Sequence, residues 1–197
     1  MTPEKQFQSE LIRGCSQYRG LVYKLPDPPK GPQALFHKAG IKPYDMQWFL
    51  PNGKIVVIEL KAVKGQTFTI CKDGVSNSLK EHQLQYLTEL SEMGHEAWVG
   101  INFQFAASEK FKKGRTGKND TYYPRCKNSF NVAYCVTIEF LQYYMQEGET
   151  TIKLEEIENQ ACNNFENVKE LHRKRIGQEW MYDPENLHYW ISNKERD

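Results

Sequence analysis

The sequence predicts an α/β domain in which helices flank a mixed central β-sheet. Two observations carry this prediction: short β-branched apolar runs are typical of buried strands, and amphipathic helical patterns stand before, between and after them. Strands and helices that alternate in this way form layered α/β domains. A chain of 197 residues with 39% hydrophobic residues is long enough to bury the core of one such domain.

The first expected element is a helix over residues 4–19, in which Phe7, Leu11 and Cys15 recur at a spacing of four residues. A connection rich in Pro and Gly follows at residues 25–32. Because Pro fixes its backbone and lacks an N–H donor, this connection can form neither a helix nor an inner strand.

A β-hairpin is the clearest local signal. Residues 44–50 alternate in polarity, residues 54–61 are β-branched and apolar, and the sequence Pro-Asn-Gly separates them at residues 51–53. Pro suits the first central position of a turn and Gly suits a left-handed position, which together are typical of a three-residue hairpin loop. Such a loop places Leu50 opposite Lys54 and thereby sets the register of the two strands.

The remaining elements follow from periodicity and turn signals. Strands are expected at 67–71, 97–103 and 131–138, and helices at 78–93, 139–146 and 151–160. The helix at 78–93 would begin with a capping box at Ser78 and end at Gly94. Since the pattern weakens after residue 162, we expect one domain over residues 1–162 and a C-terminal helical extension or tail over residues 163–197.

The formal net charge of +1 conceals two opposed blocks. Residues 108–128 carry seven Lys and Arg against two Asp and Glu, and residues 147–170 carry the reverse. The basic stretch also contains Gly and aromatic residues, so we expect a loop insertion that contacts nucleic-acid phosphates. A solvated surface loop explains the charge equally well. The basic residues singled out as DNA contacts are Lys110, Lys112, Lys113, Arg115 and Lys118.

Several classes of protein are excluded by what the sequence lacks. The longest strongly apolar run, residues 55–58, is far shorter than the ~20 residues of a membrane span. The N-terminus has no apolar segment typical of a secretory signal, and the five cysteines lack metal-binding spacings. We therefore expect a cytoplasmic protein without a membrane partner. No Walker A, G-x-S-x-G or G-x-G-x-x-G motif is present.

The hairpin register brings three ionisable side chains together. With a three-residue loop, Asp45 lies opposite Glu59, and Lys61 emerges on the same face two residues further on. Two opposed carboxylates repel each other unless a cation lies between them, and hard oxygen ligands suit Mg²⁺ or Mn²⁺. A surface salt bridge at the strand end is the competing interpretation of Glu59 and Lys61.

One polar residue interrupts the apolar stripe of the 78–93 helix. Gln83 falls among the apolar residues of this stripe, which are Leu79, Tyr86, Leu87 and Leu90. A polar side chain on a face directed to the core needs a hydrogen-bond partner. Gln83 is therefore either a satisfied core amide or a residue that reaches the carboxylates.

Together these residues resemble the PD-(D/E)XK nuclease superfamily and, within it, the RecU-type Holliday junction resolvases. The similar segments are Pro-Tyr-Asp at 43–45, Ile-Glu-Leu-Lys-Ala at 58–62, Glu-His-Gln at 81–83, and residues 94–103. The resemblance implies a restriction-endonuclease-like core. It also implies a homodimer that nicks four-way DNA junctions in recombination and repair, using Mg²⁺ with Mn²⁺ as a substitute.

The resemblance also implies roles for individual residues. Asp45 and Glu59 would hold the metal, with the carbonyl of Leu60 as a third ligand. Lys61 would position the attacking water, and Gln83 would support Lys61.

The family further places an acidic residue of the first helix near the metal. Glu10 is our choice because its neighbour in the sequence lies on the apolar stripe, and Glu4 is the competitor. Further DNA contacts are expected from Lys30, Lys38 and Lys42.

Two alternatives stay open. One is a sequence-specific endonuclease of the restriction or homing type with the same core, and the other is a non-catalytic DNA-binding module. The family inserts a longer stalk before the catalytic Asp than residues 30–42 can provide, which puts selectivity for junctions in question.

Overall fold

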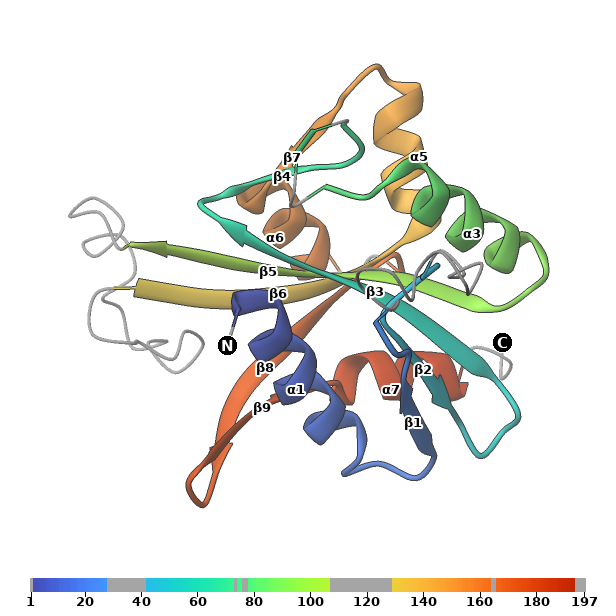
Figure 1. The fold of residues 1–197 in the computed structure, drawn as a ribbon, viewed down its shortest axis with the longest axis vertical. Helices are drawn as coiled ribbons and strands as arrows, with labels where there is room; N and C mark the ends of the chain where they lie inside the picture. The colour runs from blue at the N-terminus through green and yellow to red at the C-terminus, as the bar shows by residue number, and fades with distance from the viewer. Residues whose placement is uncertain are drawn as a thin grey trace, which may run out of the picture.

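A mixed β-sheet with helices on both faces forms the centre of the protein (Figure 1). The structure is a computed structural model and describes residues 2–27, 42–72, 74–75, 78–106, 129–163 and 166–193. The predicted class, α/β with a mixed central sheet flanked by helices, is confirmed.

The described residues contain a sheet of seven strands and a second sheet of two strands. In spatial order, the strands of the large sheet are β1 (Leu21–Lys24), β2 (Met46–Phe49), β3 (Ile55–Lys64), β5 (Glu96–Ala106), β6 (Ser129–Thr137), β8 (Val168–Ile176) and β9 (Glu179–Asp183). Among the described strand pairs of this sheet, β3 and β5 alone run parallel, because the helix between them crosses over the sheet. The small sheet pairs β4 (Thr67–Thr69) with β7 (Thr151–Lys153).

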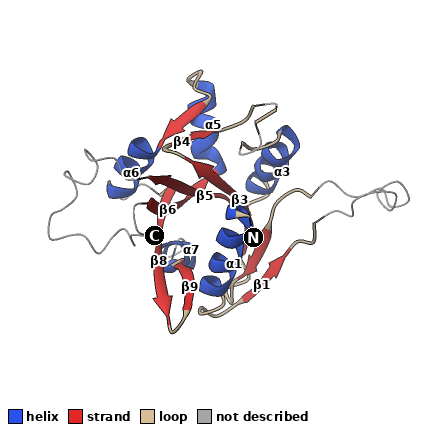
Figure 2. Cartoon of the chain, turned by 60° about the vertical axis from the view of Figure 1, so that its left-hand side comes forward, coloured by secondary structure: helices blue, strands red, loops and turns tan. Residues whose placement is uncertain are grey.

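Helices cover the two faces of the large sheet in two separate layers (Figures 1 and 2). One layer contains α1 (Pro3–Cys15) and α7 (Glu185–Asn193), and the other contains α3 (Glu81–Glu92), α5 (Ile138–Gln146) and α6 (Leu154–Cys162). A hydrophobic cluster fills the space under each layer. Strand β3 is buried on both faces, so its alternate residues contribute to both clusters.

The N-terminal helix and the hairpin match the sequence closely. Helix α1 ends at Cys15, four residues before its expected end, and its three stripe residues are all buried. The hairpin pairs Met46 with Ile58 and Phe49 with Ile55, which is the register of a three-residue loop. Gly53 takes the expected left-handed backbone conformation, with φ of 84°. The strands expected at 97–103 and 131–138 and the helix at 139–146 are confirmed as β5, β6 and α5.

Three boundaries differ from expectation. The strand at 67–71 is shortened to β4, and the first three residues of the helix expected at 151–160 form β7. Ser78 is not the N-cap of α3, since its hydroxyl donates to the carbonyls of Lys72 and Val75. The helix begins instead at Glu81, after Lys80.

The C-terminal segment differs most from expectation. Residues 163–197 were expected to form a helical extension or tail, but β8 pairs with β6, β9 pairs with β8, and α7 packs on the large sheet. Strand β8 lies near the edge of the sheet, where only Val168 and Leu171 are buried. Its other residues are mostly charged, so the strand lacks the alternating apolar pattern that would have predicted it. No helix among the described residues is long and apolar enough to span a membrane.

Candidate active site

Four side chains singled out in the sequence come together where β3 passes the first turn of α3. Glu59 and Lys61 lie on the face of β3 that packs under α3, since they alternate with Leu60 on the opposite face. Gln83 lies in the first turn of α3 and points back to them. Asp45 directly precedes β2, the strand next to β3.

Three of these side chains each contact the other two: Glu59, Lys61 and Gln83. Glu59 Oε1 accepts hydrogen bonds from Lys61 Nζ at 2.7 Å and from Gln83 Nε2 at 2.6 Å. Lys61 Nζ also donates to Gln83 Oε1 at 3.1 Å. The exposed fractions of the three residues are only 2%, 5% and 7%, so this is not the solvated surface salt bridge of the competing interpretation.

Asp45 does not form the regular cross-strand pair with Glu59 that the hairpin register predicts. Its backbone N–H donates to the carbonyl of Ile58 at 3.1 Å, and the paired register ends at Met46. Its carboxylate Oδ2 accepts from the backbone N–H of Leu60 at 2.9 Å, and Oδ1 accepts from Lys42 Nζ at 2.6 Å. The Asp45 side chain therefore bends toward β3 and remains buried, with 7% exposed.

The electrostatics of the cluster are those of two carboxylates held close in a buried space. Burial, and after it the negative charge of Asp45, raise the pKa of Glu59 to about 7, although Lys61 opposes this rise. Burial also raises the pKa of Glu4, on which the charges of Lys61 and Asp45 act in opposite directions. Glu4 is thus within electrostatic reach of the site.

The donors at the site suit a hard divalent cation. Glu59 Oε2 is buried and has no hydrogen-bond partner among the described residues, which is unfavourable for a carboxylate oxygen unless a cation satisfies it. The N–H and C=O of a strand residue point to the same neighbour, so the carbonyl of Leu60 is directed to the side of Asp45. Among the described residues, no three or more His, Cys, Asp and Glu side chains cluster as metal ligands. Two carboxylates and a carbonyl are nevertheless a sufficient protein contribution for Mg²⁺.

Glu10, the acidic residue chosen from the first helix, is engaged in an ion pair with Arg173. The Glu10 carboxylate forms a bidentate ion pair with Arg173 on β8. Arg173 Nε donates to Oε2 and Nη2 donates to Oε1, each at 2.7 Å. The competitor Glu4 lies on the same helical face as Gln8 and Leu11, at spacings of four and seven residues. Gln8 donates to the backbone carbonyl of Asp45 at 3.4 Å, a contact between residues 37 apart in the sequence.

Most of the residues expected to contact DNA lie outside the described residues. The expected contacts that lie outside are Lys30, Lys38, Lys110, Lys112, Lys113, Arg115 and Lys118. Lys42 is described, and its ammonium lies on the Asp45 carboxylate, a contact that sequence reasoning missed. Tyr86, expected on the apolar stripe of α3, is 44% exposed because it lies on the outer side of the helix.

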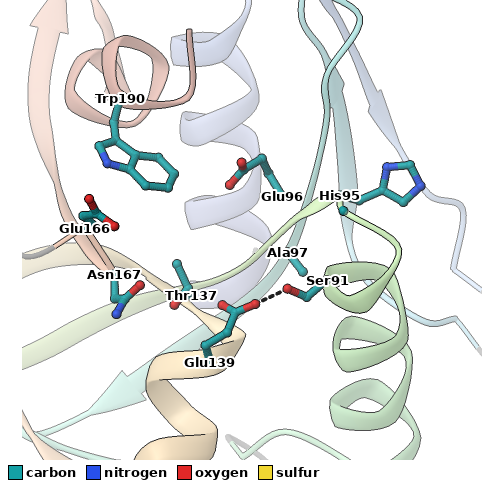
Figure 3. A pocket seen from close by; sticks show the side chains of 10 residues that line it. Ser91, His95, Glu96, Ala97, Thr137, Glu139, Glu166, Asn167 and Trp190 are labelled. Atoms are coloured by element: carbon teal, nitrogen blue, oxygen red, sulfur yellow. Dashed lines mark hydrogen bonds between the residues drawn. The ribbon is translucent and has the colours of Figure 1, made fainter. Parts of the chain in front are cut away.

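A pocket of about 260 Å³ lies elsewhere in the fold (Figure 3). Its lining includes Glu96, Glu139 and Glu166, with Trp190 from α7, and none of the predicted site residues. Ser91, at the far end of α3 from Gln83, is also part of the lining. Eight residues of helix span about 12 Å, so the pocket is separate from the carboxylate site.

Comparison with protein-family models finds no match, and comparison with curated proteins finds no related protein. The fold itself defines the class of this protein, which is α/β with a mixed central sheet flanked by helices.

Proposed function

We propose that this protein is a metal-dependent DNA endonuclease with a restriction-endonuclease-like core, acting as a Holliday junction resolvase. The observation that carries the proposal is the buried cluster of Asp45, Glu59, Lys61 and Gln83. One carboxylate oxygen of this cluster, Glu59 Oε2, has no hydrogen-bond partner in the part of the chain that the structure describes. Burying two carboxylates and an ammonium is costly for a structural purpose alone, whereas active sites commonly contain such perturbed groups.

Each residue of the cluster has a role that its contacts support. Asp45, Glu59 and the Leu60 carbonyl would hold Mg²⁺ or Mn²⁺, which when bound supplies Lewis-acid stabilisation of a phosphate. The ammonium of Lys61 is held by two acceptors, Glu59 and Gln83, and can orient a water or stabilise negative charge that develops on the phosphate. Gln83 fixes Lys61 because it accepts from Lys61 while donating to Glu59.

The substrate and the oligomeric state rest on the sequence resemblance. Four-way junctions and a homodimer are expected on that ground. The phosphate contacts of the basic residues in 108–128 rest instead on the charge and composition of that stretch. A resolvase has to nick two opposed strands, and two copies of one site satisfy this requirement by symmetry.

One observation favours the non-catalytic DNA-binding module. Each carboxylate already has a lysine partner, Lys42 for Asp45 and Lys61 for Glu59, so the cluster is close to neutral without a metal. A protein that only binds DNA could retain such a cluster as a structural network.

Incubation of the purified protein with a four-way junction, a flap and a linear duplex, with and without Mg²⁺, tests these functions. We expect the wild-type protein to nick the junction only when Mg²⁺ is present. We expect this nicking to be abolished in the variants Asp45→Asn and Lys61→Met. Lys64→Met is the matched control, because Lys64 lies on the same strand but is exposed. Junction binding without nicking would select the non-catalytic module, and cleavage of linear duplex at one site would select the sequence-specific endonuclease.

A further inference from the structure

A chain of ion pairs leads from the Asp45 carboxylate to the surface. Lys42 Nζ lies 2.6 Å from Asp45 Oδ1 and 3.1 Å from Asp27 Oδ1. The Lys42 side chain is 15% exposed, whereas that of Asp27 is 47% exposed. Lys5 Nζ lies 3.6 Å from the other oxygen of Asp27. Lys42 thus bridges a buried carboxylate and one in contact with solvent.

Asp27 is held beside the site by the backbone. The N–H of Leu25 donates to the carbonyl of Asp45 at 2.9 Å, which fixes the chain two residues before Asp27. Asp27 can therefore retain the Lys42 ammonium if that ammonium leaves Asp45.

A divalent cation at the two carboxylates would bring two further positive charges into a cluster that two lysines already neutralise. Like charges in a space of low polarity repel strongly, so the ammonium of one lysine has to move away from its carboxylate. Lys61 is 5% exposed and held by both Glu59 and Gln83. Lys42 is closer to solvent and has a second partner outside, so Lys42 can move at the lower cost.

We propose that Lys42 is the resident counter-ion of Asp45, which a divalent cation must displace, and that Asp27 receives it. This inference rests on the proposed metal site. The affinity of the site for metal is then set by competition with Lys42. Paired with the exposed Asp27, the displaced ammonium lies nearer to solvent and can also contact a phosphate, which is the role that the sequence predicts for Lys42.

Binding of Mn²⁺ in the absence of DNA tests the inference directly. Isothermal titration calorimetry and the electron paramagnetic resonance signal of free Mn²⁺ measure the dissociation constant without any activity. We expect Lys42→Met, and equally Lys42→Gln, to lower this constant about tenfold, since removal of a close charge has effects of this size. Lys5→Met, which removes only an exposed partner of Asp27, should change it less than about twofold.

A double-mutant cycle isolates the part played by Asp27. In the wild-type background, Asp27→Asn should weaken Mn²⁺ binding by roughly two- to fivefold, because the displaced lysine loses its exposed partner. In the Lys42→Met background the same change should have a smaller effect, since no lysine remains to be received. Equal effects of Asp27→Asn in both backgrounds would overturn the role of Asp27.

The outcomes separate this inference from the proposed function. Loss of Mn²⁺ binding in Asp45→Asn would demonstrate that the wild type binds Mn²⁺ through Asp45. If the two Lys42 variants then bind Mn²⁺ no more tightly than the wild type, the inference about Lys42 fails while the metal site stands. Binding by the Lys42 variants alone would support the inference. Absence of binding in every protein, each with a cooperative thermal transition, would overturn both the inference and the proposed metal site.

Discussion

Gln83 connects the start of a helix to the candidate site through one amide group. Its Oε1 accepts from the backbone N–H of Lys80 and from Lys61 Nζ, both at 3.1 Å, and its Nε2 donates to Glu59. The same side chain therefore caps α3 and orients the buried ion pair. Because the contacts with Lys61 and Glu59 are buried, no apolar side chain can replace the amide without leaving these two groups short of a partner.

We expect Gln83→Leu to lower the free energy of unfolding by about 2–4 kcal/mol, since it leaves a buried charge pair short of partners and removes a helix cap. Urea denaturation measures the change. Gln85→Leu is the control, because Gln85 lies on the same helix and donates to Glu89 at an exposed position. Similar losses for the two variants would contradict the role of Gln83.

Glu59 makes the stability of the metal-free protein depend on pH. Its pKa is about 7 in the folded protein and near 4.5 when unfolded, so folding favours the protonated carboxyl. Stability should therefore fall as the pH rises from about 4.5 to 7, by on the order of 3 kcal/mol, and the loss should be complete above 7. Thermal melts at pH 5 and pH 8 measure this change.

A divalent cation should offset this loss, because it stabilises the ionised form of Glu59. Mg²⁺ or Mn²⁺ should accordingly raise the melting temperature more at pH 8 than at pH 5. The side chain at position 59 cannot ionise in Glu59→Gln. In this variant the metal-induced rise of the melting temperature should therefore be the same at pH 8 and pH 5. A metal-induced rise of equal size in Glu59→Gln and wild type would exclude Glu59 as a ligand.

Helix α1 and strand β8 are joined by a buried ion pair. The side chains of Glu10 and Arg173 are 4% and 3% exposed, and the Arg173 guanidinium lies 4.6 Å from the ring centre of Trp180. Through α1, this pair also supports Gln8, which contacts the backbone of Asp45. The ends of the chain thus meet at an element that borders the candidate site.

Arg173→Met should destabilise the protein by about 3–5 kcal/mol, because it leaves the buried Glu10 carboxylate without its positive charge, with Gln6 Nε2 still donating to it. Adding Glu10→Leu should recover much of this loss, since the double variant contains no buried charge at that place. Chemical denaturation of the single and double variants measures both effects. Arg175→Met, at an exposed position on the same strand, should change stability by less than about 0.5 kcal/mol. Simple addition of the two single losses would contradict this account.

These elements differ in how far the sequence could predict them, and the difference is physical. The hairpin register depends on the loop at residues 51–53, whose turn residues are local, so it was predictable. Gln83 could be recognised because a polar residue interrupted an apolar stripe. Glu10 could not be placed, since its partner Arg173 is 163 residues away and no local pattern links them. The position of Lys42 was missed for a related reason: its contact with Asp45 depends on how Asp45 bends at the end of the ladder.

At the scale of the whole molecule, residues 166–193 complete the central sheet and one of its two helical layers. Strands β8 and β9 extend the sheet beyond β6, and Tyr182 packs on Phe7 of α1 with ring centres 5.0 Å apart. Leu187 and Ile191 of α7 are fully buried in the cluster that α1 also lines. Removal of this segment would expose the β6 edge and leave α1 without its ion-pair partner.

A chain ended at residue 162 should therefore fail to fold into a stable monomer. The exposed β6 edge offers unpaired backbone groups to other chains, and the loss of Arg173 leaves Glu10 without its partner. Thermal melts followed by circular dichroism should lack a cooperative transition, and size-exclusion chromatography should find aggregates. A chain ended at residue 193, which retains α7, should melt within a few degrees of the full chain. A cooperative transition of the shorter chain at the temperature of the full one would instead identify residues 1–162 as an independent domain.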